Sequence, residues 1–435
     1  MTQTRIPRGA ADGLGALDRK VAFRLVPLLA LGYLIAYLDR VNVGMAKLQM
    51  QSDLGLSDAA YGLGAGLFFV SYILLEVPSN HIVTRVGARV WMARIMITWG
   101  ILTAVTSLVH ADWQFYLLRF LIGAAEAGFF PGVLYYLTLW FPTILRGRII
   151  SYFILGLPVA SMIGNPVGGW IMKTFHHALG LSGWQWLFIV LGVVPVVVGI
   201  CYLFALPRSP ESAQWLSEQE KAQLRDRLRR DSGGTAAHGA HSFRRALCSG
   251  RVWLLGYMCF ASLMATYCIS FWLPTFIADT GTKDPQTVGL LSAIPAACGA
   301  LALLLNGWHS DRTRERRWHI AVPLTISAVA FTATTFFSGQ LLWVIVLFTI
   351  ANAALVAHYA VFWCLPGTFL HGPAAAAGFA LVSSIGNVGG LFATYAVGWI
   401  RDAAGSASPS IWLFAAVLLS SAIVALRLPA REVDR

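Results

Sequence analysis

Residues 184–206 read WQWLFIVLGVVPVVVGICYLFAL, a continuous run without a charged side chain. At a rise of about 1.5 Å per residue, a helix of this length crosses the hydrocarbon core of a bilayer, which is roughly 30 Å thick. A spanning segment must satisfy its backbone hydrogen bonds within lipid, and runs of this length favour helices over barrel strands. The run therefore predicts a transmembrane helix.

The rest of the chain repeats this pattern. Of its 435 residues 57% are hydrophobic and only 12% are charged, with a mean hydropathy of +0.66, whereas a water-soluble domain carries about 25% charged residues. These values predict an all-α membrane protein. Twelve runs qualify as transmembrane helices, near residues 22–42, 59–79, 93–110, 114–138, 149–172, 184–206, 252–278, 287–308, 319–338, 341–364, 374–399 and 410–427.

The spans divide into two sets of six. Residues 1–206 are predicted to form an N-terminal six-helix bundle, and residues 251–435 a C-terminal one. Residues 207–250 are polar and are predicted to form a cytoplasmic linker. Within the linker, the sequence SEQE at 217–220 is a capping box that opens a short amphipathic helix.

Short motifs recur at an offset close to half of the chain. The sequence SMIGN at 161–165 returns as SSIGN at 383–387, and Arg85 matches Arg312 at nearly the same offset. The recurrence predicts two pseudo-symmetric bundles. Proteins built in this way place a binding site between the halves.

Basic residues predict the orientation of the chain. With the N-terminus in the cytoplasm, 26 of the 32 lysine and arginine residues, including those at span edges, fall on the cytoplasmic side. Four, Lys47, Lys173, Lys283 and Arg401, fall outside, and two lie within spans. Both termini are therefore expected in the cytoplasm. The net charge of +12 is explained as an orientation signal, so no nucleic-acid partner is expected.

Four charged residues lie deep within predicted spans of the N-terminal half, whereas Arg24, Glu76 and Arg94 lie near span ends. Asp39 and Arg40 are adjacent in the first span, and Arg119 and Glu126 are two helical turns apart in the fourth, so the latter two share one helix face. Each charge costs roughly 2.5–3.5 kcal/mol to insert, and such groups persist where they pair or face a watery path. An ion pair between Asp39 and Arg119 is geometrically possible. The pattern indicates a site for protons and anions, with a purely structural ion-pair network as the alternative.

Several segments resemble the major facilitator superfamily and, within it, the anion:cation symporter family. The loop after the eighth span carries the G-x-x-x-D-R signature, and its copy after the second span is degraded, with Asn80 and Thr84 replacing the glycine and aspartate. The resemblance runs from about residue 20 to the last span. The segments that carry it are YLDRVNVG at 37–44, EVPSN at 76–80, RFLIGAAEAGFFPG at 119–132, WFP at 140–142, GWQW at 183–186 and GWHSDR at 307–312.

The resemblance implies a role for each charged residue. It links Glu126 and Asp39 to protonation, and Arg40 and Arg119 to a substrate carboxylate, which a guanidinium binds bidentately. Whether Asp39 is a proton site or a structural latch stays open. The signature residues are expected to control gating; they are Arg85, Gly87, Gly307, Asp311 and Arg312.

The predicted spans of the C-terminal half contain no charged residue except Arg427, the last residue of the final span. We therefore expect neutral groups there to recognise the rest of the substrate, Asn387 and Ser383 above all. In the N-terminal half, Tyr37 and Tyr72 either line the pocket or only pack against neighbouring helices. The other neutral candidates in the C-terminal half are Tyr267, Trp272, Asn352, Tyr359 and Ser384.

Together, these features lead us to expect a proton-coupled symporter in a bacterial inner membrane that imports a small organic anion. The family includes permeases for tartrate, phthalate, hydroxyphenylacetate and sugar acids, and the sequence does not choose among them. An exporter or antiporter of organic anions, and a membrane sensor, are the alternatives. We expect no enzyme activity, since G-x-S-x-G and H-E-x-x-H are absent. We also expect a monomer that contacts membrane lipid and has neither a cofactor nor a metal site.

Overall fold

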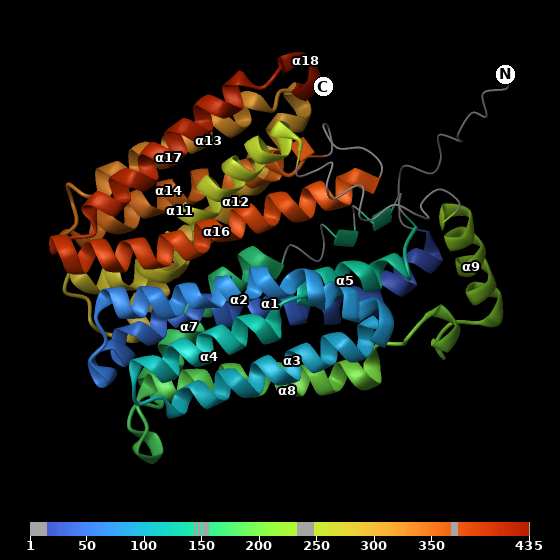
Figure 1. Cartoon of the computed structure of the whole chain (residues 1–435), viewed down its shortest axis with the longest axis horizontal. Coiled ribbons are helices and arrows are strands. Elements are labelled where there is room, and N and C mark those ends of the chain that lie inside the picture. Colours follow the sequence, from blue (N-terminus) through green and yellow to red (C-terminus); the bar gives the residue numbers. More distant parts are fainter. Residues whose placement is uncertain are drawn as a thin grey trace.

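The computed structural model describes residues 15–142, 145–146, 149–150, 156–232, 248–366 and 373–434. Every regular element in these ranges is a helix, which confirms the predicted all-α class. Figure 1 shows them as two bundles, α1 to α8 in one and α11 to α17 in the other. The helices are α1 (Ala16–Leu54), α2 (Asp58–Val86), α3 (Ala88–Val105), α4 (Asp112–Glu126), α5 (Phe129–Thr138), α7 (Gly156–Thr174), α8 (Gly183–Ala205), α9 (Glu218–Ser232), α11 (Gly250–Asp279), α12 (Pro285–Thr313), α13 (Arg317–Thr334), α14 (Leu341–Phe362), α16 (Pro373–Ala404), α17 (Ser408–Arg427) and α18 (Ala430–Val433), with 3-10 turns η2 (Thr106–Leu108), η3 (Ala178–Gly180) and η4 (Pro210–Ser212).

The helices occupy the predicted membrane spans. Within the described residues, ten helical segments are long and apolar enough to cross a bilayer. Two further helices, α7 and α13, lie where the sequence predicts the fifth and ninth spans. Residues 151–155 of that fifth span lie outside the described residues. The chain is therefore a multi-pass membrane protein.

The linker helix α9 lies at the end of the molecule where α1 begins and α17 ends (Figure 1). Its predicted capping box forms, because Ser217 Oγ accepts from the N–H of Glu220 at 3.2 Å and Glu220 accepts from the N–H of Ser217 at 2.8 Å. Ion pairs from Lys20 to Glu220 at 2.8 Å and from Arg227 to Asp18 at 3.2 Å tie α9 to α1. Residues 233–247 of the predicted linker lie outside the described residues.

The predicted span 114–138 contains a break that the hydropathy pattern does not reveal. The α4 helix ends at Glu126, and α5 begins at Phe129. Between them Ala127 has extended backbone angles, and Gly128 has a φ of +90°, a region that favours glycine. A side chain at position 128 would also meet that of Ser79 on α2. The break therefore places Glu126 at the end of a helix.

Among the described residues, the two bundles contact each other mainly through three helix pairs. These are α2 with α16, α7 with α12, and α1 with α11, and α1 also touches α12. The α7–α12 pair approaches closely because glycines face backbone on both sides: Gly169 meets Pro285, and Gly289 meets Asn165. Within the described residues, the ion pairs between the bundles lie at the opposite end of the molecule, where α1 ends and α2 begins; we call it the far end (Figure 1).

Candidate functional site

An ion pair joins α1 to α4 in the middle of the N-terminal bundle. Arg40 Nε donates to Oε1 of Glu126 at 2.9 Å, and Nη2 of the same arginine contacts the same oxygen. The Glu126 side chain is 1% exposed, whereas that of Arg40 keeps 16% of its surface accessible. Glu126 Oε2 is buried and has no hydrogen-bond partner among the described residues. The pair therefore combines a sealed carboxylate with a partly accessible guanidinium.

One aromatic ring of α2 contacts both arginines of the site. The guanidinium carbon of Arg40 lies 5.0 Å from the Phe68 ring centroid, and that of Arg119 lies 4.9 Å from it. Arg40 also lies 4.8 Å from the ring of Tyr72. Cation–π contacts of this kind strengthen where water is excluded. Phe68 and Tyr72 thus hold the cations that the sequence predicts as substrate ligands.

Asp39 and Arg119 are both buried, but they do not form the ion pair that the sequence made possible. Each is 1% exposed. Both Asp39 carboxylate oxygens, and Nε and Nη2 of Arg119, lack a hydrogen-bond partner among the described residues. The Thr103 hydroxyl on α3 is also buried without a partner there. Such groups usually bond to protein or ordered water, so this part of the N-terminal bundle has polar capacity that the described residues leave unused.

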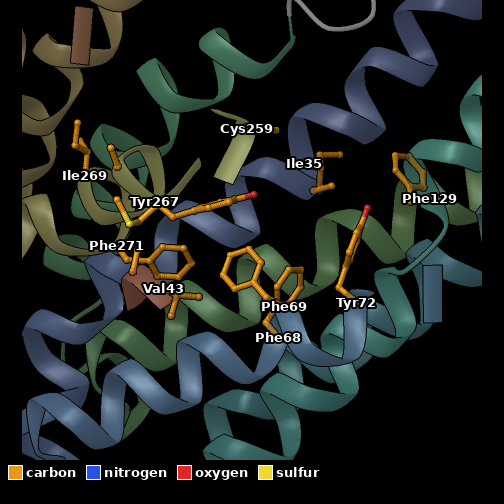
Figure 2. Close-up of a cluster of buried hydrophobic side chains, with 14 of the residues drawn as sticks. Ile35, Val43, Phe68, Phe69, Tyr72, Phe129, Cys259, Tyr267, Ile269 and Phe271 are labelled. Atoms are coloured by element: carbon orange, nitrogen blue, oxygen red, sulfur yellow. The ribbon is translucent and has the colours of Figure 1, made fainter. Parts of the chain in front are cut away.

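A chain of ring contacts leads from this site into the C-terminal bundle. Phe68 lies 5.8 Å from Tyr72 and 5.3 Å from Phe69, and Phe69 lies 4.6 Å from Tyr267 on α11. Figure 2 shows these rings, with Tyr267 and Tyr72 flanking the two phenylalanines. Arg40 interacts electrostatically with the hydroxyls of both tyrosines. Tyr267 is therefore a residue of the C-terminal bundle that the structure links to the charged pair.

The other predicted pocket residues have different surroundings. Tyr37 lies in a small buried cluster with Val41 and with Ala160 of α7. Asn387, which is 8% exposed, and the partly buried Ser383 lie on α16. Neither side chain makes a hydrogen bond to a described residue, so both keep polar groups available within this part of the chain. The structure does not bring these two into contact with Arg40.

The signature residues lie mostly within helices. Gly307, Asp311 and Arg312 belong to the last turns of α12, which continues to Thr313, so this segment is helical where the sequence predicts a loop. Arg85 lies in the last turn of α2, and Gly87, with a φ of +92°, separates α2 from α3. In the described residues, His, Cys, Asp and Glu side chains form no group of three or more that is suited to a metal ion.

A charged cluster at the far end was not predicted from the sequence. We call it the far-end cluster: Lys47, Asp58, Asp279, Arg401 and Asp402. Asp58 pairs with Lys47 at 2.7 Å and, across the bundles, with Arg401 at 2.7 Å. Arg401 also binds Asp279 at 2.7 Å, and Asp402 accepts from the N–H groups of residues 58 and 59 at 3.2 and 2.8 Å. In the sequence, Lys47 and Arg401 stand out only as two of the few basic residues on the outer side, which does not indicate that they form a cluster.

Comparison with known proteins supports a transport role. Residues 29–379 match the family model described as Major Facilitator Superfamily. The chain is 51% identical to the Pseudomonas putida protein named "Putative metabolite transport protein NicT", with 97% of each chain covered. It is 41% identical to a "Putative tartrate transporter" of Agrobacterium vitis, covering 94% of this chain and 90% of the relative. It is also 39% identical to a "Quinolone resistance transporter" of Acinetobacter baumannii, with 93% of each covered.

Solved structures share the same arrangement of helices. A bacterial homologue of the human lysosomal transporter Spinster, in an inward-facing and unoccupied conformation, superposes with a TM-score of 0.72. The alignment covers 95% of this chain and 96% of that chain, at 18% sequence identity. At this identity the likeness extends to the fold alone.

Proposed function

Because this chain belongs to the major facilitator superfamily, we propose that it is a proton-coupled symporter that imports a small organic anion by alternating access. The observation that carries the proposal is the contact between Arg40 and Glu126, in which a buried carboxylate is bound by a partly accessible guanidinium. Arginine is suited to binding a carboxylate because its planar donors match the two carboxylate oxygens. The same guanidinium has two candidate partners, Glu126 and the substrate.

Competition for Arg40 supplies a coupling mechanism. While Glu126 is ionised, it occupies Arg40 and weakens the binding of an anion. Protonation of Glu126 removes that charge, and Arg40 becomes available to the substrate carboxylate. Substrate and proton then bind together. Arg119 is the second candidate for the carboxylate, and Asp39, buried without a hydrogen bond to a described residue, is the second candidate proton site.

The far-end cluster supplies the gate of the proposed cycle. With the termini in the cytoplasm, the cluster lies on the periplasmic side of a bacterial inner membrane. Its ion pairs hold Asp58 of α2 to Arg401 of α16, while Lys173 of α7 binds Asp284, the residue before α12, at 3.1 Å. Breaking these contacts is required for the two bundles to separate on that side. The conformation described here is then closed toward the periplasm.

Neutral aromatic groups complete the proposed pocket. Tyr72 and Tyr267 place hydroxyls near Arg40 from opposite bundles, and Asn387 and Ser383 offer polar groups on α16. These residues suit a substrate with a carboxylate at one end and hydrogen-bonding or aromatic groups at the other. A dicarboxylate such as tartrate, an aromatic acid and a sugar acid all meet this description. The proposal includes no catalytic step, and the transporting unit is taken to be one chain.

The proposal is tested in proteoliposomes that contain the purified full-length chain. Tartrate, benzoate and gluconate represent the three substrate classes, and a thermal-shift screen selects the probe. With Glu126→Gln we expect loss of accumulation driven by a proton gradient, while exchange of labelled for unlabelled acid survives. Asp112→Asn, at the exposed opposite end of α4, is the control and should accumulate the probe normally. Full gradient-driven accumulation by Glu126→Gln would exclude the mechanism.

An exporter is the second candidate function, because one relative is named as a quinolone resistance transporter. The two arginines of the site favour anions over cationic drugs. Transport direction distinguishes the candidates in cells that express the chain. An uncoupler should lower uptake of the probe acid if the chain imports it. Increased retention of the acid, or of a quinolone, after uncoupling would favour export.

A further inference from the structure

The membrane-facing wall of the C-terminal bundle contains a groove of about 620 Å³ between α12, α13 and α14. It lies along the C-terminal half of α12, at the end remote from the far-end cluster. The groove exists because small residues leave space on α14, namely Ala353, Ala354 and Ala357, and because Pro323 lies opposite them on α13. The remaining lining residues are Ala302, Leu305, Asn306, Trp308, His309, Ile326 and Ile350.

One end of this groove is polar, unlike the rest. His309 Nδ1 lies 2.6 Å from His319 Nε2, and His319 Nδ1 is buried without a hydrogen-bond partner among the described residues. Asn306 donates to the carbonyl oxygens of His319 and Ala357 at 3.0 Å each, which joins the three helices at this point. The groove is thus apolar along most of its length and ends at hydrogen-bonding groups.

The polar end also carries positive charge. The guanidinium of Arg312 lies 5.5 Å from the ring of Trp308, which is 60% exposed. Residues 307–317 contain four arginines but only two acidic residues. Among the described residues, Arg312 and Arg314 have no carboxylate within ion-pair distance. Tryptophan is typical of the membrane interface, so this end of the groove lies at the depth of lipid headgroups.

We propose that this groove is a binding site for an anionic phospholipid. One acyl chain lies along the alanines of α14, and the phosphate lies at the end formed by His309 and Arg312. Basic pockets between membrane helices attract anionic headgroups in this way. A long apolar groove with a cationic end matches an amphiphile with a negatively charged head. A zwitterionic phospholipid brings the same phosphate but also a cation beside it, which the positive end of the groove repels.

A second groove of the same protein, which lacks charged groups, serves as a comparison. This membrane-facing groove, of about 370 Å³, lies between α3 and α8. It contains no ionisable residue, since its lining consists of Ile101, Ala104, Val105, Ser107, Leu108, Gly192, Val193 and Val196. This groove should take an acyl chain without preference for the headgroup.

The test counts phospholipids that stay bound to the purified full-length protein by native mass spectrometry. Phosphatidylglycerol and phosphatidylcholine with identical acyl chains are the probes. We expect one phosphatidylglycerol to bind at a concentration at least tenfold lower than phosphatidylcholine. Ala354→Trp, which fills the groove, should remove this binding. Val193→Trp, which fills the second groove, should leave it unchanged.

A second variant separates the headgroup from the chain. His309→Gln combined with Arg312→Gln leaves the groove open, so phosphatidylglycerol should bind no better than phosphatidylcholine. Thermal melting identifies variants that fail to fold, and Ala354→Leu is the milder substitute for Ala354→Trp. Equal binding of both lipids by the unaltered chain, or selective binding that survives Ala354→Trp in folded protein, would overturn the proposal.

Discussion

Arg40 Nε lies 2.9 Å from Oε1 of Glu126, at the residue where α4 ends. The carboxylate is sealed from solvent and its second oxygen has no partner, so the guanidinium is its one compensating contact among the described residues. A charge in this position is costly unless it is paired. The stability of the N-terminal bundle and the proposed coupling therefore depend on the same contact.

Removing one partner should destabilise the protein more than removing both. We expect Arg40→Gln to lower the free energy of unfolding by about 3 kcal/mol, because it leaves the Glu126 carboxylate buried without its cation. The double variant Arg40→Gln/Glu126→Gln should recover most of this loss. Thermal melting in detergent at neutral pH measures both.

The control for this prediction is the exposed pair of Lys173 and Asp284, whose side chains are 52% and 37% exposed. Lys173→Gln should change stability by less than about 1 kcal/mol, as is usual for surface ion pairs. A double variant as unstable as Arg40→Gln would show that Glu126 is not charged in the folded Arg40→Gln chain.

The far-end cluster should set the balance between closed and open conformations. Arg401→Gln removes one contact to Asp58 and two to Asp279. If the closed conformation loses about 1.4 kcal/mol of stabilisation, the ratio of open to closed protein rises tenfold. The reporter is a cysteine placed at the fully buried Thr394, in a chain without its six native cysteines. We therefore expect this cysteine to react about tenfold faster with an impermeant maleimide, added outside cells, when the chain also carries Arg401→Gln.

Lys283 provides the matched control for this measurement. It is an exposed cation predicted on the same side, and it makes no ion pair with a described residue. Lys283→Gln should leave the labelling rate at Thr394→Cys unchanged. An equal rate in the Arg401→Gln and Lys283→Gln chains would mean that the far-end cluster does not hold the bundles together.

The sequence predicts the fold well because lipid imposes a simple constraint. Each span must be long, apolar and helical, so hydropathy alone locates the helices. Hydropathy does not report backbone angles, which is why residues 114–138 are predicted as one span although Gly128 breaks it. The FFPG sequence at 129–132 follows the break, but the pattern of apolar residues continues through it.

The site is only partly predictable. The cost of charge in lipid singles out Asp39, Arg40, Arg119 and Glu126, and the structure buries all of them except Arg40 almost completely. Their pairing depends on how each helix is rotated about its axis, which one sequence does not specify. The sequence made an ion pair of Asp39 with Arg119 possible, whereas the structure pairs Arg40 with Glu126.

The far-end cluster illustrates a different limit. Its cations, Lys47 and Arg401, were counted only as two of the few basic residues on the outer side, because the positive-inside rule weighs totals and assigns no partner to a single charge. Their partners are distant in the sequence: Arg401 in the C-terminal bundle contacts Asp58 in the N-terminal bundle, as well as Asp279. Long-range pairs of this kind need either a structure or an alignment of relatives.

The break before α5 should be intolerant of a side chain. Gly128→Ala places a residue with a Cβ at a φ of +90°, which costs about 1–2 kcal/mol, and also pushes against Ser79. Gly281→Ala is the control, because Gly281 has a φ of +100° but no neighbour that a Cβ would meet. We expect Gly128→Ala to melt at a lower temperature than Gly281→Ala. Equal losses would assign the whole effect to backbone angles and none to the contact with α2.

The C-terminal segment should give the protein an acid-sensitive contact. Burial opposes the charge of Asp434, but the N–H groups of Arg316 and Arg317 and the Arg317 side chain, at 2.7 Å, hold its pKa below the usual value. A lowered pKa contributes stability above the ordinary aspartate value of about 3.9, and this contribution is lost as pH falls through the folded-state value. We therefore expect Asp434→Asn to cost about 2 kcal/mol at pH 7 and progressively less below pH 4, measured by thermal melting against the unaltered chain. A cost that stays constant down to pH 3 would show that the ionised carboxylate is not what holds this segment.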